Sequence, residues 1–92
     1  MFDWDRHNLR KIRAHVIDRE EVEQVFLNDP IGIYEQMIGE ERRFVYYGET
    51  NAHRKLAVIV TDRGELIRVV TAYDLDAGQK REYFQRRIRW EV

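Results

Sequence analysis

The 92-residue sequence has no cysteine, a single proline and no long run of apolar residues. Without cysteine the chain can form neither a disulfide nor a thiolate zinc site, and it has no thiol nucleophile, which fits a reducing compartment. No stretch approaches the roughly 20 apolar residues of a membrane helix, and the charged opening MFDWDRHN does not resemble a signal peptide. We therefore expect a cytoplasmic protein without a membrane segment.

Motifs for nucleotides, metals, flavins or a serine triad are also lacking, so we expect no cofactor and no metal site. The length suits one domain over residues 1–92, and 43% hydrophobic with 36% charged residues favours a folded core under a solvated surface. The net charge of −1 hides an uneven distribution, in which residues 6–15 are basic and residues 18–41 are acidic. This pattern allows an anion-binding face, although helix surfaces of different sign would produce it too.

Two helices are predicted before Pro30. Asp5 can cap the first, in which apolar residues at helical spacing leave three arginines on the outer side. The apolar residues are Leu9, Ile12 and Val16, and the arginines are Arg6, Arg10 and Arg13. Asp18 and Glu21 have the capping-box spacing of a second helix, which ends at Asn28-Asp29-Pro30. Its apolar stripe consists of Val22, Val25 and Phe26.

The pattern then changes to that of strands. Four successive segments favour β structure: IGIYEQMI, RRFVYYG, KLAVIVT and ELIRVVTAY. Gly64 can supply the positive φ of a tight hairpin between the last two. Asp76 and Gln79 then have capping-box spacing for a final helix, with an apolar side of Tyr83, Phe84, Ile88 and Trp90. We predict an α+β fold, an antiparallel four-stranded meander sheet with two N-terminal helices and one C-terminal helix, the helices covering one face.

Several separated motifs resemble one protein family in their order along the chain. They are Phe2, Trp4, Asp5, Asn8, Lys11, His15-Val16, Glu21-Val22, Val25–Pro30, Gly39–Arg42, Gly48, Leu56–Val60 and Ile67–Ala72. Together they resemble the BrnT toxins of bacterial type II toxin–antitoxin modules over nearly the whole chain. The resemblance implies a RelE-like fold, RNA as substrate, metal-independent cleavage and silencing by a cognate antitoxin that also binds DNA. A ribbon-helix-helix antitoxin is expected, and a homodimer is left open.

Two departures from the family pattern bear on activity. Where the family usually reads Ile-Ser-Ala-Arg and another basic residue, this chain has Val70-Thr71-Ala72-Tyr73-Asp74. His15 is usually followed by Gly-Val, but here Val16 follows directly, which alters the turn between the first two helices. One interpretation is a ribonuclease toxin in which Tyr73 has become the acid. The alternative is a non-catalytic BrnT-like module that binds protein or RNA and has lost activity.

Metal-free RNA cleavage needs a base for the 2′-hydroxyl, donors for the phosphorane and an acid for the 5′-oxygen. Arg68 is the candidate donor, because a guanidinium can bond two phosphate oxygens at once. A buried guanidinium needs some anion, so a structural ion pair, for instance with Glu40 or Glu41, is one alternative and simple exposure is another. Of Arg42 and Arg43 only one can share its face, and we expect the family-motif residue Arg42 to do so.

His15 and Tyr73 are the candidates for proton transfer. An imidazole can act as base or acid near neutrality, although a histidine at a helix end can instead serve as a C-terminal cap. Strand alternation puts Tyr73 on the face opposite Arg68, unless a bulge or the strand end near Thr71 turns it round. The predicted catalytic residues are therefore His15, Arg68 and Tyr73.

The final helix, QKREYFQRRIRW, mixes cations with aromatic residues. Lys80 and Arg81 could hold an RNA backbone while Tyr83 or Trp90 stacks on a base. The same spacing is typical of an amphipathic helix that packs on a sheet. With Arg42 and Arg68, these two cations complete the predicted RNA-binding set.

Overall fold

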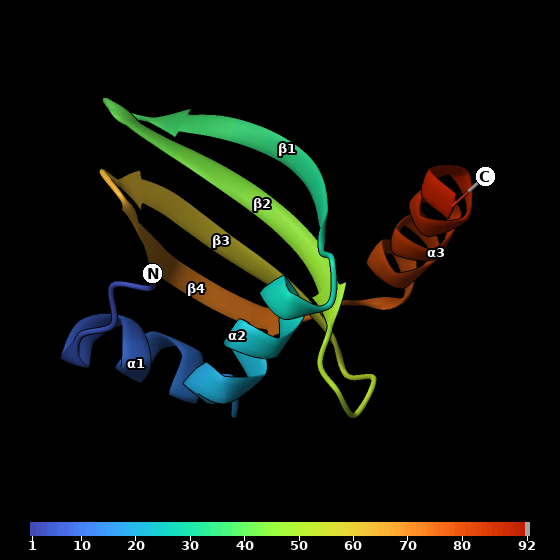
Figure 1. The fold of residues 1–92 in the computed structure, drawn as a ribbon, viewed down its shortest axis with the longest axis horizontal. Coiled ribbons are helices and arrows are strands. Elements are labelled where there is room, and N and C mark those ends of the chain that lie inside the picture. The colour runs from blue at the N-terminus through green and yellow to red at the C-terminus, as the bar shows by residue number, and fades with distance from the viewer. Residues whose placement is uncertain (92) are drawn as a thin grey trace.

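The computed structural model describes residues 1–91, with the side chains of all of them except Arg63, Trp90 and Glu91. Two helices precede four strands and a third helix follows, as the sequence predicts (Figure 1). The elements are α1 (Arg6–Arg13), α2 (Arg19–Leu27), β1 (Ile31–Ile38), β2 (Glu41–Glu49), β3 (Lys55–Arg63), β4 (Leu66–Asp74) and α3 (Ala77–Glu91). The strands pair antiparallel in the order β1-β2-β3-β4, which confirms the predicted meander.

All three helices begin with a reciprocal pair of hydrogen bonds between side chain and backbone. In each, the residue before the helix accepts from a backbone N–H three residues later and donates its own N–H to that residue's side chain. The pairs are Asp5 with Asn8, Asp18 with Glu21, and Asp76 with Gln79. The helix starts read from sequence are therefore confirmed.

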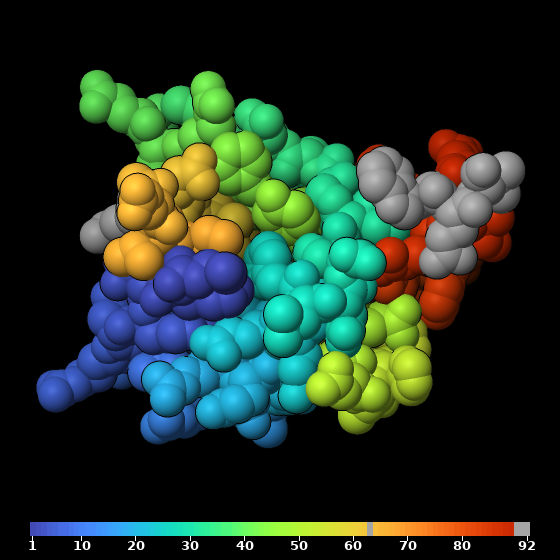
Figure 2. Space-filling model, in the orientation of Figure 1, coloured from blue at the N-terminus to red at the C-terminus, as the bar shows by residue number. Residues whose placement is uncertain are grey.

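The larger core lies between one face of the sheet and the helices α1 and α2. It contains the apolar residues Ile12, Ile17, Val22, Val25, Leu56, Val58, Val60, Val69 and Ala72. Figure 2 shows α1 and α2 as one continuous layer on this side of the molecule. Gly48 of β2 allows the close approach of α2, because an added Cβ would lie 2.7 Å from Cγ1 of Val25 and 3.3 Å from Cβ of Pro30. Val16, expected on this apolar side, is instead exposed beyond the end of α1.

A second core lies on the opposite face of the sheet and is closed by α3. It contains Val45, Tyr47, Ala57, Leu75 and Tyr83, of which the three strand residues alternate with those of the first core. The expectation that all helices cover one face is therefore wrong. The chain leaves β4 through Leu75, which is itself buried in the second core, and this turn carries α3 to the other side, where it stands apart from α1 and α2 (Figure 1).

Tyr83 anchors α3 to the sheet. Its ring is fully buried, its hydroxyl donates to Glu49 at 2.8 Å, and Arg87 donates to the same hydroxyl at 2.8 Å. Burial raises the pKa of Tyr83 above its usual value. Phe84 and Ile88, predicted on the packed side, are exposed, whereas the prediction for Trp90 falls on a side chain outside those described.

The first residues of the chain lie along the outer edge of β4. Phe2 forms a parallel bridge with Ile67, whose N–H donates to Met1 and whose carbonyl accepts from Asp3, both at 2.8 Å. Asn8, buried in α1, donates to the carbonyl of Asp3 at 2.7 Å and so ties this segment to the helix. Among the described residues, no helix is long and apolar enough to cross a membrane.

Candidate active site

A β-bulge in β4 places Tyr73 on the same face of the sheet as Arg68. Ile59 pairs with Thr71 but the next residue of β3, Val60, pairs with Val69, so Val70 is left without a partner in the register. The extra residue reverses the alternation of β4 at this point. The bulge that Tyr73 needed in order to share a face with Arg68 is therefore present. The two residues are nevertheless far from each other along the sheet. Arg68 pairs with Thr61 and Tyr73 with Ala57, and these two positions are about 13 Å apart along β3.

The turn after α1 positions His15. Val16 donates its N–H to the carbonyl of Arg13 at 2.9 Å, and Ile17 donates to that of Ile12 at 3.1 Å. This is the Schellman pattern, in which the residue in the position of Val16 adopts left-handed backbone. Val16 has a φ of 58°, a conformation that suits glycine and is rare for a β-branched residue. The residue that alters the family's turn thus keeps the backbone geometry that a glycine would adopt.

This turn brings the imidazole of His15 beside the phenol of Tyr73. The ring centroids are 6.3 Å apart and the planes are inclined by 53°. His15 is exposed and Tyr73 is half-buried, so solvent and a substrate can reach the pair. The two residues nominated for proton transfer therefore come together from elements that are far apart in sequence.

Arg54, just before β3, holds this region together. Its Nε and Nη2 donate to the two carboxylate oxygens of Asp74 at 2.7 and 2.9 Å. Its Nη1 donates to Glu21, at 3.2 Å from the nearer oxygen, and to the carbonyl of Val16 at 2.8 Å. A further bond from Nη2 reaches the carbonyl of His15 at 3.3 Å. One guanidinium thus joins the turn after α1, the start of α2 and the end of β4.

Asp74, which stands where the resemblance leads us to expect a cation, is instead paired with Arg54. The hydrogen bonds from Arg54 lower the pKa of Asp74, burial opposes them, and the charges of Arg54, Lys80 and His15 lower it further. Lys80 of α3 is therefore within electrostatic reach of the same end of β4. Lys80 and Arg81 are both exposed, and neither makes an ion pair with a described residue.

Arg68 lies at the other end of β4 and is engaged by acidic residues. Its Nη1 is 2.6 Å from Oδ2 of Asp5 and 3.8 Å from Oδ2 of Asp3. The Asn8 N–H and the Arg68 guanidinium together hold the pKa of Asp5 below its usual value. Of the alternatives for Arg68 the structural ion pair is the one present, but its partner is Asp5 rather than Glu40 or Glu41. The pairing of N-terminal residues with β4 explains this, because it brings Asp3 and Asp5 beside Arg68.

The structure does not place Arg42 beside Arg68. Arg43, Thr61 and Arg68 face each other across β2, β3 and β4, so Arg43 shares the face of Arg68 and Arg42 points to the other face. The expected pairing of Arg42 with Arg68 is therefore wrong. Arg42 lies 3.8 Å from Glu35, and Arg43 is bound by Glu41 at 2.9 Å.

Sequence reasoning did not select Arg54. It precedes β3 in the turn NAHRK, far from any motif that suggested chemistry. The one available signal was Asp74, because a carboxylate in place of an expected cation requires a new cation nearby. The sequence did not show which of its cations that would be.

The fold and this site define a class of protein: a small α+β domain with an antiparallel four-stranded sheet and a histidine–tyrosine pair near cations. Comparison with protein families identifies it further, because the model described as "Ribonuclease toxin, BrnT, of type II toxin-antitoxin system" matches residues 4–78. The chain belongs to the BrnT family and is a ribonuclease toxin of a type II toxin–antitoxin system. RNA is accordingly its substrate and a cognate antitoxin its partner. No curated protein matches the chain.

Proposed function

We propose that this toxin cleaves RNA by general acid–base catalysis without a metal, with His15 as base and Tyr73 as acid. The observation that carries the proposal is the 6.3 Å separation of the two rings at an accessible end of β4. A catalytic acid or base must come within about 2.6–3.2 Å of the proton it transfers. Rings this close together can each reach a different oxygen of one bound phosphodiester.

In the proposed reaction, His15 takes the proton of a ribose 2′-hydroxyl and the 2′-oxygen attacks the adjacent phosphorus. The bond between phosphorus and the 5′-oxygen breaks, and the phenol of Tyr73 gives its proton to the departing oxygen. The products are a 2′,3′-cyclic phosphate and a 5′-hydroxyl. The imidazolium then returns a proton to the phenolate, either directly or through water, so no group is consumed.

Lys80 and Arg81 are the proposed phosphate ligands at this end of the sheet. Lys80 acts on Asp74 electrostatically, and both cations lie at the start of α3, just beyond the residues that the family model matches. They would take the place of the basic residues that Tyr73 and Asp74 replace. The contact with Asp5 supports a structural role for Arg68, and the exposed Arg42 stays a prediction as an RNA contact outside the pair of rings.

Two further features belong to the proposal. The antitoxin is expected to be of the ribbon-helix-helix type, and a homodimer of the toxin is left open. The cytoplasm, where RNA is found, is the expected location.

The test is RNA cleavage in excess chelator by His15→Gln and Tyr73→Phe, with His7→Gln and Tyr34→Phe as matched controls at exposed positions. We expect each site variant to lose about 100-fold or more in rate, the usual contribution of a catalytic acid or base. The controls should keep the rate of the parent. Retention of full activity by both site variants, or activity that disappears in chelator, would contradict the proposal.

A second comparison separates the two roles considered for Arg68. If Arg68 acts only by binding Asp5, then Arg68→Ala and Asp5→Asn should have similar effects on stability and on cleavage rate. A phosphate ligand would instead make Arg68→Ala much the less active of the two at equal stability. That outcome would return Arg68 to the catalytic set.

A further inference from the structure

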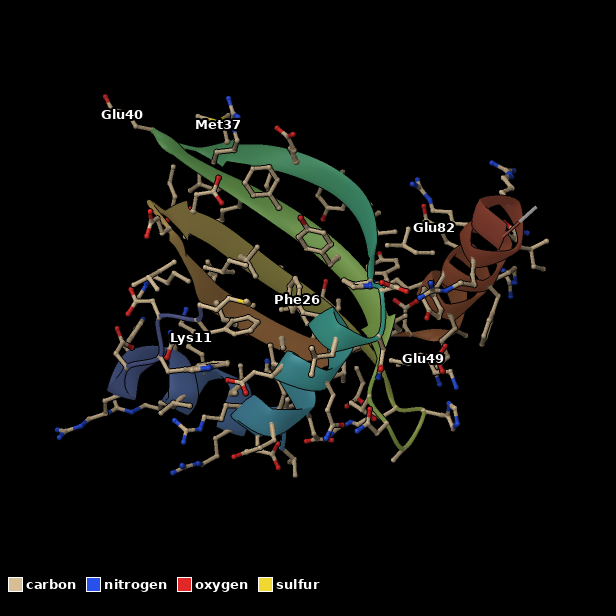
Figure 3. The ribbon with its side chains drawn as sticks, viewed as in Figure 1. Lys11, Phe26, Met37, Glu40, Glu49 and Glu82 are labelled. Carbon is tan, nitrogen blue, oxygen red and sulfur yellow. The ribbon has the colours of Figure 1, made fainter. Side chains whose placement is uncertain are left out.

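The outer side of α1 carries cations that the rest of the protein leaves unused. Arg6, Arg10, Lys11 and Arg13 are all exposed, and none forms an ion pair with a described residue. The helix has no acidic residue of its own. Figure 3 shows nitrogen-tipped side chains that project from α1 away from the remainder of the molecule.

Most exposed arginines on α2, β1–β2 and the middle of α3 do have carboxylate partners, whereas α1 has four cations without one among the described residues. Several arginines elsewhere are paired: Arg19 with Glu20, Arg42 with Glu35, Arg43 with Glu41, and Arg86 with Glu82. Three carboxylates near α1 already bind other groups. Asp5 binds Arg68 and caps the helix, Asp18 caps α2, and Glu21 binds Arg54. The α1 cations therefore face solvent while nearby acids are engaged with other groups.

Helix stability explains only part of this distribution. Arg10, Lys11 and Arg13 lie in the last turn, where cations interact favourably with the helix dipole. Arg6 lies in the first turn, where the dipole disfavours a positive charge. With spacings of four and three residues, Arg6, Arg10 and Arg13 fall in one stripe along the helix.

The stripe leads to the proposed catalytic pair. Arg13 precedes His15 by two residues, and the turn between them ends α1 beside Tyr73. An RNA strand lying along α1 would therefore pass its next phosphate to the two rings. A row of unpaired cations that ends at a cleavage site fits a polyphosphate backbone better than an isolated anion, since each arginine can engage a separate phosphate.

We propose that Arg6, Arg10 and Arg13 form a backbone-binding track that holds single-stranded RNA as it enters the site at His15 and Tyr73. The proposal rests on the proposed function for its direction, but it concerns binding rather than cleavage. It adds a contact surface outside the predicted set of Arg42, Arg68, Lys80 and Arg81.

The test measures binding alone, in a His15→Gln/Tyr73→Phe background, by fluorescence anisotropy of a labelled single-stranded RNA between 50 and 200 mM KCl. The variant Arg6→Gln/Arg10→Gln/Arg13→Gln removes the track. Arg19→Gln/Arg86→Gln/Arg89→Gln removes the same charge from exposed and partly exposed positions on α2 and α3 and serves as the control. A third variant with lysine at all three α1 positions keeps the charge.

For single strands each phosphate contact contributes about 0.7 to the slope of log K against log salt, so loss of three contacts should reduce the slope by about 2. Between 50 and 200 mM KCl, the factor by which salt weakens RNA binding should then be roughly 20-fold smaller in the α1 variant than in the parent. The control and the lysine variant should keep most of the parent slope. Thermal unfolding of each variant checks that α1 is intact.

An unchanged slope in the α1 variant overturns the track, as does an equal loss in the control, which would indicate a general charge effect. An α1 variant that binds RNA normally but no longer binds an acidic protein partner would also overturn it. Failure of cleavage in the intact toxin would count against the acid–base proposal alone, because binding is measured independently.

Discussion

Arg54 binds Asp74 through two hydrogen bonds, Nε to Oδ1 at 2.7 Å and Nη2 to Oδ2 at 2.9 Å. This bidentate geometry is the strongest form of arginine–carboxylate contact. The same guanidinium also holds Glu21 and the backbone around His15. A carboxylate that replaces an expected cation therefore helps to fix the position of a proposed catalytic residue.

Arg54→Ala is expected to destabilise the fold. It would remove the Arg54 hydrogen bonds to Asp74, Glu21 and two backbone carbonyls, and we expect a loss of about 1–3 kcal/mol in the free energy of unfolding. Urea denaturation at neutral pH measures it. Arg19→Ala, which breaks an exposed pair with Glu20, should cost at most about 1 kcal/mol. Equal losses in the two variants would show that the Arg54 hydrogen bonds contribute no more to stability than an exposed ion pair.

The pH dependence of stability should reflect the lowered pKa of Asp74. A carboxyl group whose pKa is lower in the folded state stabilises the protein above its ordinary value of 3.8, and this contribution is lost as the pH falls through the folded pKa. Asp74→Asn should therefore lower stability at pH 7 and reduce the further loss on acidification below pH 4. Urea unfolding at several pH values measures both effects. The control is Asp29→Asn, at an exposed position without an ion pair to a described residue. A steeper acid loss in Asp74→Asn than in the parent would contradict the expectation.

Gly48→Ala should weaken the packing of α2 on the sheet. The added Cβ would lie 2.7 Å from Cγ1 of Val25, inside any normal contact distance, and relief requires movement of the buried Val25 side chain, of α2 or of Pro30. We expect a loss of about 1–3 kcal/mol in unfolding free energy, as for other overpacked cores. Gly32→Ala is the matched control, because its Cβ would meet only the ring of Tyr46 at an ordinary 3.6 Å. A Gly48→Ala protein as stable as Gly32→Ala would show that α2 adjusts freely.

Val16→Gly should raise stability. Val16 has a φ of 58° and is 81% exposed, so glycine relieves backbone strain and sacrifices little packing. Strain of this kind costs about 1–3 kcal/mol, against about 0.5–1 kcal/mol for the extra freedom of glycine in the unfolded chain. We expect a net gain of about 1 kcal/mol, measured as a higher melting temperature. Ala14→Gly, at a neighbouring right-handed position, should lower it, and a lower melting temperature for both variants would refute the strain argument.

Local features of the fold were predictable because their causes lie within a few residues. Asp18 with Glu21 and Asp76 with Gln79 specify helix starts over a span of four residues, and Gly64 specifies its turn by its own φ of 63°. The placement of α3 was not predictable in this way. It depends on Leu75 and Tyr83 meeting a second core whose buried strand residues come from β2 and β3, and no single stretch of sequence contains that core.

The site shows the same division. His15 and Tyr73 were selected from motif and chemistry, but their proximity depends on a turn and a bulge that no local pattern predicted. Arg68 was recognised as a residue that needs an anion, yet its partner lies 63 positions away in the chain. Alternation in a flat strand also gave the wrong face for Tyr73, because Val70 interrupts it.

The first three residues are hydrogen-bonded to Ile67 along the outer edge of β4, and they cover part of this edge strand. A bare outer strand offers free N–H and carbonyl groups to any extended segment of another molecule, which is how sheets fuse into aggregates. Met1 and Asp3 occupy those groups near Ile67, and the Arg68 contact with Asp5 keeps them in place. Arg68, which was expected to hold substrate, thus helps to keep an edge strand covered, and a covered edge disfavours aggregation through strand pairing.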